Sequence, residues 1–208
     1  MQKVRIGVLI SGGGTNLQAL IDNIEKGFIN GEIVVVISDK KGAYGIERAK
    51  KHGIRAIEID KREFDVKDAF MKAIINELEN NDVELVVLAG FLSILSQDFI
   101  DRYRNRIMNI HPSLIPAFCG KGYYGQRVHK AVLEYGAKVS GATVHFVDEG
   151  ADTGPIILQE AVKVEDDDTP ESLAARVLNV EHKLLPQAVK LYCEGKLIVE
   201  GRKVRIRA

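Results

Sequence analysis

An amide and an imidazole side chain lie two residues apart near the middle of the chain, at Asn109 and His111. The apolar residues around them predict a strand, in which alternate side chains point to one face, so the two groups should lie roughly 6.6 Å apart along it. Pro112 should end the strand, because proline restricts the preceding residue and cannot donate to a neighbouring strand. An amide donor beside a titratable ring suits a carbonyl group that becomes an oxyanion.

A glycine-rich segment, residues 11–16, follows the apolar run 4–10 and precedes apolar residues at helical spacing. This order predicts a strand, a glycine loop and a helix. Glycines let the backbone approach a ligand, and the amides at a helix start favour an anion such as a phosphate. A tight turn that binds no ligand explains the same pattern.

Apolar strands alternate with amphipathic helices along the whole chain. Besides residues 4–10 and the strand before Pro112, strands are predicted at residues 33–37, 54–59, 85–89, 139–147 and 156–164, with a terminal hairpin at 197–206. Helices are predicted up to Gly27, at 44–51, 66–78 and 128–135, and after Thr169 with a kink or restart at Pro186. This alternation predicts an α/β fold, doubly wound, with a mostly parallel sheet and helices on both faces. Ligands of such sheets bind beyond the carboxyl ends of the strands.

The composition is that of a globular protein without net charge. Of 208 residues, 46% are apolar, and 29 basic residues balance 29 acidic ones, so neither a nucleic acid nor a membrane surface is expected as a partner. We find no secretory signal and no apolar run of about 18 residues, which favours a cytoplasmic protein. Cys119 and Cys193 are expected to be reduced thiols, and no pair of histidines has the spacing of a metal site.

Two irregular segments and one acidic run have simple explanations. Residues 117–127 are either a mobile loop beside the site or a plain connector. Residues 148–155 form an acidic turn that side-chain hydrogen bonds to the backbone would explain without a function. Residues 165–168 are expected to be a solvated run ahead of a helix.

His145 lies within a predicted strand. It is expected to be either a core residue whose hydrogen bonds are satisfied or a residue that supports the site.

Five motifs together resemble the folate-dependent formyltransferases that act on glycinamide ribonucleotide. They are residues 11–17, 88–92, 109–116, 144–147 and 152–155, and the similarity runs from about Lys3 to Leu197. The resemblance implies a Rossmann-like formyltransferase fold and transfer of the formyl group of 10-formyltetrahydrofolate, as co-substrate, to the amine of glycinamide ribonucleotide in purine synthesis. It also implies a single domain over residues 1–208, with a phosphate-binding half at about 1–105 and a folate and catalytic half at about 106–208. The expected partners are small molecules, without a metal, and the expected assembly is a monomer or homodimer.

The same resemblance assigns roles to individual residues. The catalytic group would be Asn109, His111 and Asp152, with Asn109 and His111 stabilising an oxyanion and Asp152 keeping His111 protonated. The substrate phosphate would bind at Gly14, Thr15 and Asn16, and the substrate amine at Glu181. The folate would contact Lys67, Leu92, Ser93, Ile94, Leu95, Asn109 and Asp148. Ser93 and Leu178 stand where some members of the family carry Arg and a polar side chain.

Other functions share parts of this pattern. A formyltetrahydrofolate hydrolase resembles the chain around the catalytic group but uses water as acceptor, and it usually carries a regulatory domain. Methionyl-transfer-RNA formyltransferases need a second domain and an RNA-binding surface. A non-catalytic nucleotide-binding module would use the glycine loop alone. The loop lacks the third glycine of the dinucleotide fingerprint, which makes a nicotinamide enzyme a weaker alternative, although Asp39 could bind a ribose.

Overall fold

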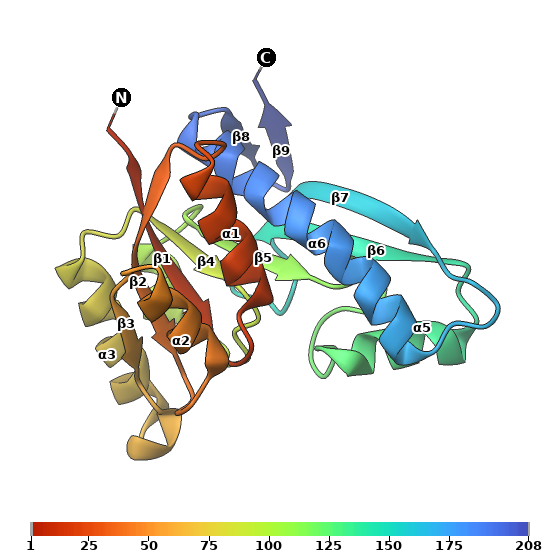
Figure 1. Cartoon of the computed structure of the whole chain (residues 1–208), viewed down its shortest axis with the longest axis horizontal. Coiled ribbons are helices and arrows are strands. Elements are labelled where there is room, and N and C mark those ends of the chain that lie inside the picture. The colour runs from red at the N-terminus through yellow and green to blue at the C-terminus, as the bar shows by residue number, and fades with distance from the viewer. Residues whose placement is uncertain (1, 208) are drawn as a thin grey trace. The chain divides into compact units, whose positions relative to one another are not determined.

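The computed structural model describes residues 2–207, and the chain divides into two compact units, residues 1–108 and 109–208 (Figure 1). The sequence prediction of one domain with two halves remains a prediction. Each unit has a layer of strands with helices against it.

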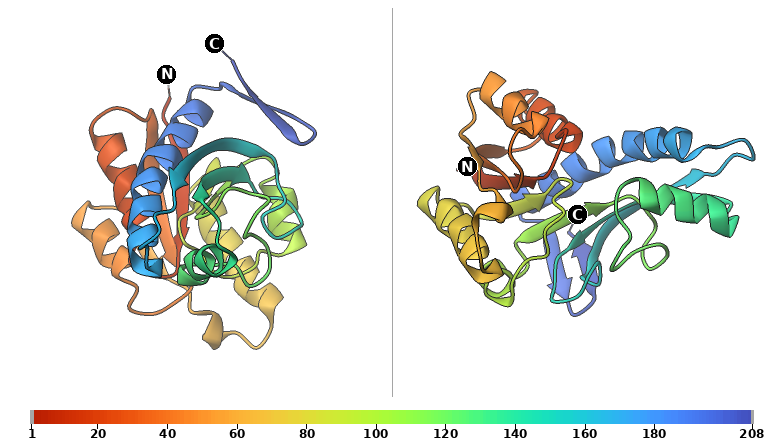
Figure 2. Two further views of the ribbon diagram at one scale, coloured as in Figure 1. Left: turned by 90° about the vertical axis from the view of Figure 1, so that its right-hand side faces the viewer. Right: turned by 90° about the horizontal axis from the view of Figure 1, so that it is seen from below.

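The first unit is a parallel sheet with helices on both faces. Its strands are β1 (Val4–Ile10), β2 (Gly31–Ser38), β3 (Ala56–Glu58) and β4 (Leu85–Leu88), in the order β3-β2-β1-β4. Strand β1 pairs in parallel with β2 and β4, and β2 pairs in parallel with β3. The helices are α1 (Thr15–Glu25), α2 (Tyr44–Lys51), α3 (Lys67–Asn80) and α4 (Gln97–Arg102), with a 3-10 turn, η1 (Lys61–Glu63). Figure 2 shows α1 and α2 on one face of these strands and α3 on the other.

The second unit begins within β5 (Ile107–His111) and continues through α5 (Gln126–Tyr135), β6 (Val139–Phe146), β7 (Ile156–Lys163), α6 (Pro170–Cys193), β8 (Leu197–Glu200) and β9 (Lys203–Ile206). The strand order is β5-β6-β7-β9-β8. Strands β6 and β7 are antiparallel, as are β8 and β9, whereas β7 and β9 pair in parallel. Helix α6 packs against α5, β6 and β7.

The predicted α/β class with a mostly parallel sheet is confirmed. Strand β4 is buried at every position, and β1 is buried from Ile6 to Ile10. A continuous apolar strand of this kind is stable only where both faces of the sheet are covered, and covered faces are what distinguish parallel sheets from most antiparallel ones. Burial on both faces therefore explains why these strands lack the polar alternation of a half-exposed sheet.

One alternative predicted for α6 and the predicted solvation of Asp168 are wrong, and one strand is shorter than expected. Helix α6 does not restart at Pro186 but runs through it, because the buried residues on either side, such as Leu184 and Ala188, hold it against the sheet. A kink at Pro186 stays a prediction. Asp168 is not solvated: its side chain is 2% exposed and accepts hydrogen bonds from Arg176 at 2.6 and 2.9 Å. This ion pair holds the pKa of Asp168 well below its usual range. The predicted strand 54–59 narrows to Ala56–Glu58.

Candidate active site

The second unit brings together the three residues predicted to be catalytic. Asn109 and His111 lie at the carboxyl end of β5, and His111 is only 4% exposed. Asp152 lies in the turn after β6, with a backbone φ of 57° that is uncommon for a residue other than glycine. His145 of β6 is the fourth member of the group.

The two ring nitrogens of His111 have different partners. Nε2 lies 3.0 Å from the carbonyl oxygen of Phe118, which can only accept a hydrogen bond, so we assign a proton to Nε2. Nδ1 lies 3.5 Å from Oδ2 of Asp152. Nδ1 is therefore the ring atom that can gain or lose a proton while the bond to Phe118 is kept.

The carboxylate of Asp152 lies between two histidines. Its Oδ2 accepts a hydrogen bond from the backbone nitrogen of Gly120 at 2.9 Å, and its Oδ1 lies 3.6 Å from Nε2 of His145. Burial opposes ionisation of this carboxyl group, but His145, His111 and the Gly120 amide together outweigh it and lower the pKa of Asp152. Asp152 is thus ionised at neutral pH.

His145 fixes the orientation of the Asn109 amide. Its Nδ1 lies 2.8 Å from the carbonyl oxygen of Phe146 and must donate to it. A protonated His145 ring would donate from Nε2 toward Oδ1 of Asp152, 3.6 Å away. We assign the lone pair of the neutral ring to Nε2, which lies 3.1 Å from Nδ2 of Asn109. One amide N–H of Asn109 therefore donates to His145, and the other can donate to a ligand.

The charge state of His111 results from opposing influences. Burial has the largest effect and lowers the pKa of His111, while the charge of Asp152 and the carbonyl of Phe118 partly offset it, and His145 adds to the lowering. The neutral ring is therefore the main form at pH 7. Asp152 acts in the direction that the sequence predicted, since it favours the protonated ring, but burial has the larger effect.

In the first unit, the glycine loop has the geometry of an anion site. Gly14 has a φ of 70° and directly precedes α1, whose first turn carries no acidic residue. An added Cβ at Gly14 would lie 2.7 Å from the Cα of Gly45, whereas Gly12 and Gly13 face open space. Nε of Arg48 donates to the carbonyl oxygen of Gly13 at 2.8 Å. The loop thus combines the amides of a helix start with a nearby guanidinium group.

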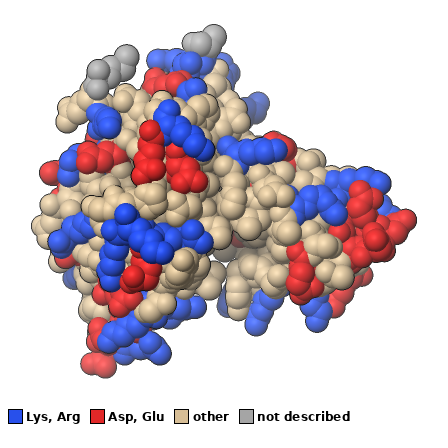
Figure 3. All heavy atoms as spheres, viewed as in Figure 1, with Lys and Arg blue, Asp and Glu red and all other residues tan. Residues whose placement is uncertain are grey.

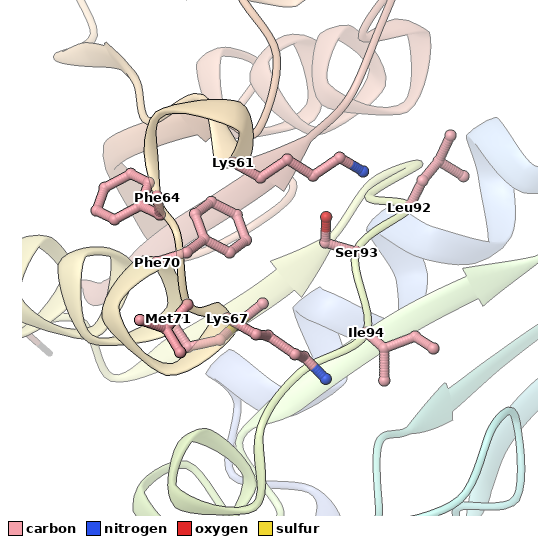
Figure 4. Close-up of a pocket in the computed structure, with 9 residues that line it drawn as sticks. Lys61, Phe64, Lys67, Phe70, Met71, Leu92, Ser93 and Ile94 are labelled. Carbon is pink, nitrogen blue, oxygen red and sulfur yellow. The ribbon is translucent and has the colours of Figure 1, made fainter.

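A pocket of about 490 Å³ lies beside the start of α3 in the first unit (Figure 4). Its lining consists of Lys61, Phe64, Val66, Lys67, Phe70, Met71, Leu92, Ser93 and Ile94. Figure 4 shows Lys61 and Lys67 extending from one wall toward the segment 92–94. An apolar wall with two ammonium groups suits a ligand that has an apolar body and an acidic end.

Four of the residues predicted to bind the folate line this pocket together, namely Lys67 and residues 92–94. Leu95, predicted with them, is buried and lies outside the lining. The hydroxyl of Ser93 donates to Oδ2 of the buried Asp39 at 2.6 Å. Ser93, one of the two residues that depart from the family pattern, therefore forms a hydrogen bond with another residue of the first unit.

Two further predicted contacts lie in the second unit. Asp148 accepts hydrogen bonds from the backbone nitrogen of Gly150 and from the hydroxyl of Thr153, as expected of a turn that stabilises itself. Glu181 is a buried residue of α6. Their contacts with a ligand remain predictions.

Two basic residues at these sites had no signal in the sequence that identified them, and a third residue, His145, had no signal for its partner. Arg48 and Lys61 are ordinary basic residues by their local pattern, and only the folded chain places Arg48 on Gly13 and Lys61 at the pocket. His145 was expected to be a core or supporting residue, and its support proves to act on the Asn109 amide. Tertiary contacts of this kind do not produce a periodic pattern of residue types in a sequence.

No metal cluster or membrane span is evident in residues 2–207. The described histidine, cysteine and acidic residues form no group of three or more that could hold a metal ion, and none of the described helices could cross a bilayer. Basic and acidic side chains are interspersed on the face shown in Figure 3, in keeping with the balanced composition.

Comparison with known proteins gives the same family in sequence and in structure. Residues 4–189 match the formyl transferase family. A chloroplastic phosphoribosylglycinamide formyltransferase of Arabidopsis thaliana is 41% identical over 94% of this chain and 68% of its own length. The crystal structure of glycinamide ribonucleotide transformylase 1 from Symbiobacterium toebii superposes with a TM-score of 0.95 and 47% identity, covering 100% of this chain and 95% of that one.

Some relatives are much longer than this chain. The trifunctional purine biosynthetic protein adenosine-3 of Gallus gallus is 45% identical over 95% of this chain, which spans only 19% of that protein. The chain therefore corresponds to one part of such a protein, and activities of its other parts have no bearing on these 208 residues.

Proposed function

The chain belongs to the formyl transferase family, and on that premise we propose that it transfers the formyl group of 10-formyltetrahydrofolate to the amine of glycinamide ribonucleotide. The family match confirms the resemblance found in the sequence. The proposal is carried by one observation: in a chain of this family, Asn109, His111 and Asp152 form a connected group.

The substrate amine attacks the formyl carbon and converts its carbonyl oxygen to an oxyanion. The N–H of Asn109 that does not bind His145 donates to this oxygen. His145 thereby acts as a positioning residue, because it decides which way the amide points. Collapse of the intermediate breaks the bond between the formyl carbon and the folate nitrogen, which leaves with a proton.

His111 and Asp152 handle the proton that the attacking amine loses. A protonated Nδ1 of His111 donates to the oxyanion, and Asp152, 3.5 Å away, stabilises the imidazolium ring that this requires. Asp152 also helps to move the amine proton, directly or through water. Because burial lowers the pKa of His111, protonation is favoured mainly when negative charge develops on the substrate.

The glycine loop binds the substrate phosphate in this proposal. Gly14, Thr15 and Asn16 provide the start of α1, where backbone amides and the helix dipole favour a phosphate. Arg48, bonded to the loop at Gly13, adds positive charge. Glu181 would bind the substrate amine.

Asn16→Ala should raise the KM for glycinamide ribonucleotide by about tenfold or more and leave the KM for the folate unchanged, because a hydrogen bond to a charged group contributes about 1.5 to 3 kcal/mol. Steady-state kinetics with each substrate varied in turn measures both constants. Asn23→Ala is the control, since Asn23 lies on the same helix and its amide donates to the carbonyl of Ala19. An equal rise in both constants would refute the phosphate assignment.

The pocket of the first unit receives part of the folate in this proposal. Phe64, Phe70 and Met71 offer an apolar wall for an aromatic body, and Lys67 pairs with the acidic tail. Lys61 extends into the same pocket, so it adds a second cation for that tail. Asp148 and Leu95 do not line this pocket, and in this proposal they contact the folate from elsewhere.

Lys67→Met should raise the KM for 10-formyltetrahydrofolate by about twofold to fivefold, the range of an exposed ion pair, and the effect should shrink as salt is added. Initial rates at several ionic strengths provide the measurement. Lys72→Met removes the same charge from an exposed position of the same helix outside the pocket. If the two variants behave alike, Lys67 does not contact the folate.

A single assay separates the transferase from its nearest rival. The purified chain is given 10-formyltetrahydrofolate with and without glycinamide ribonucleotide, and loss of the formyl group is followed. Loss that requires the amine supports the transferase, whereas loss without it favours a formyltetrahydrofolate hydrolase. No loss in either arm would favour a non-catalytic nucleotide-binding module.

We extend the proposal to organisation and location. Residues 1–208 act as one formyltransferase domain, which works as a monomer or homodimer on small molecules in the cytoplasm. The balanced charge supports the absence of a nucleic acid partner. Light scattering of the purified chain tests the assembly.

A further inference from the structure

We propose that Phe118 is a positioning residue for His111 and that contacts of its ring with Tyr123 and Tyr135 hold its backbone in place. The effect on turnover rests on the proposed function. The effect on the His111 ring can be measured without any substrate, so the two can fail separately.

The backbone of Phe118 adopts an unusual conformation at the point where it contacts His111. Its φ is 50°, in the left-handed region that residues with a side chain rarely occupy. Its carbonyl oxygen accepts hydrogen bonds from Nε2 of His111 at 3.0 Å and from Oγ of Ser113 at 3.3 Å. A return to an ordinary φ would turn this carbonyl away from the His111 ring, so something must hold the strained conformation.

Two tyrosines contact the ring of Phe118 edge to face. The ring centroids lie 6.4 Å from Tyr123, at an interplanar angle of 68°, and 5.8 Å from Tyr135, at 76°. Both arrangements are favourable for aromatic pairs. Tyr135 is the last residue of α5 and is 82% exposed, so burial of its own surface does not explain its position. Its contact with Phe118 links the end of the helix to the loop.

The same loop segment also reaches the second ionisable group of the site. Two residues after Phe118, the backbone nitrogen of Gly120 donates to Asp152 at 2.9 Å, with a φ of 89° that suits glycine. The segment 118–120 therefore contacts both His111 and Asp152. Contacts that hold Phe118 in place would therefore also keep the side chains of His111 and Asp152 in position.

Loss of the ring contacts of Phe118 should change the pKa of His111 in a defined direction. The Phe118 carbonyl accepts a hydrogen bond from His111 and so favours the protonated ring, and its withdrawal lowers the pKa of His111. Three other ionisable groups lie near this ring. Asp152 raises the pKa of His111, and His145 lowers it. The third group is His129 of α5, and its own pKa is lowered by burial and by His111. Changing Tyr135 alters none of these groups.

Tyr135→Ala should lower the pKa of His111 in an NMR titration of the substrate-free protein. It should also lower kcat by about threefold to tenfold, the range that the loss of an aromatic pair represents, with both KM values little changed. The exposed position of Tyr135 means that the fold should tolerate the change. Tyr135→Phe keeps the ring and should match the wild type in both measurements.

Tyr124→Ala is the matched control, because Tyr124 is an exposed tyrosine of the same loop whose ring lies under the guanidinium of Arg127 at 4.8 Å. It should leave the pKa of His111 unchanged. An unchanged pKa in Tyr135→Ala, or an equal shift in Tyr124→Ala or Tyr135→Phe, would overturn the inference. A shifted pKa in Tyr135→Ala alone, in a chain without transferase activity, would support the positioning role and refute the proposed function.

Discussion

His111→Ala should lower kcat by about a hundredfold or more at saturating concentrations of both substrates, the scale of a lost acid-base or oxyanion group. The imidazole is the side chain that can change charge at Nδ1 beside Asp152 while Nε2 stays bonded to Phe118. Alanine removes both functions together. The Phe118 carbonyl keeps Ser113 as a donor in the variant, so the loop retains one of its contacts.

His52→Ala is the control for this variant. His52 follows α2 in the first unit, where its ring bonds to Glu25 rather than to any group of the proposed catalytic site. Its kcat should stay within about twofold of the wild type, as expected for a surface change. A His111→Ala protein that is folded by circular dichroism and retains near-normal kcat would exclude His111 from the chemistry.

Asp152→Asn should also lower kcat by about a hundredfold or more, although it preserves the shape of the side chain. The amide oxygen of asparagine can still accept the hydrogen bond from Gly120, so the turn keeps that contact. What is lost is the negative charge beside His111, which favours its protonated ring. The pKa of His111 should therefore fall further, and an NMR titration together with the pH profile of kcat measures both changes.

Asp166→Asn removes an equal charge from an exposed position of the same unit, where Asp166 pairs with Lys138. It should change neither kcat nor the pKa of His111. If Asp152→Asn turned over at a near-normal rate, the pair of His111 and Asp152 would be structural. If the rate fell while the pKa of His111 did not move, Asp152 would act on the proton of the amine alone.

These two variants test one idea about the site, which is that burial and charge oppose each other at His111. Burial favours the neutral ring, and Asp152 and the Phe118 carbonyl favour the protonated one. A ring balanced in this way can take up a proton when an oxyanion forms nearby and release it afterwards. A fully exposed histidine would have no such dependence on its two partners.

The sequence by itself determined the fold class and the family. Apolar runs such as residues 4–10 and 85–88 can be stable only in a covered sheet, and helical spacing between the runs specifies the crossovers. The motif around Asn109 and His111 is local as well, because alternation along a strand decides which side chains share a face. Local periodicity of this kind can be read from the order of residues without the tertiary structure.

Only the tertiary structure decided the partners of those side chains. The ring of His145 orients Asn109 from another strand, Phe118 fixes the proton on Nε2 of His111, and Asp168 is buried against Arg176 instead of being solvated. Arg48 and Lys61 join their sites for the same reason. Hydrogen bonds, ion pairs and burial depend on atoms that approach from distant positions in the chain, and a pKa depends on all of them together. The sequence therefore identified the chemical groups, and the fold set their proton positions and charges.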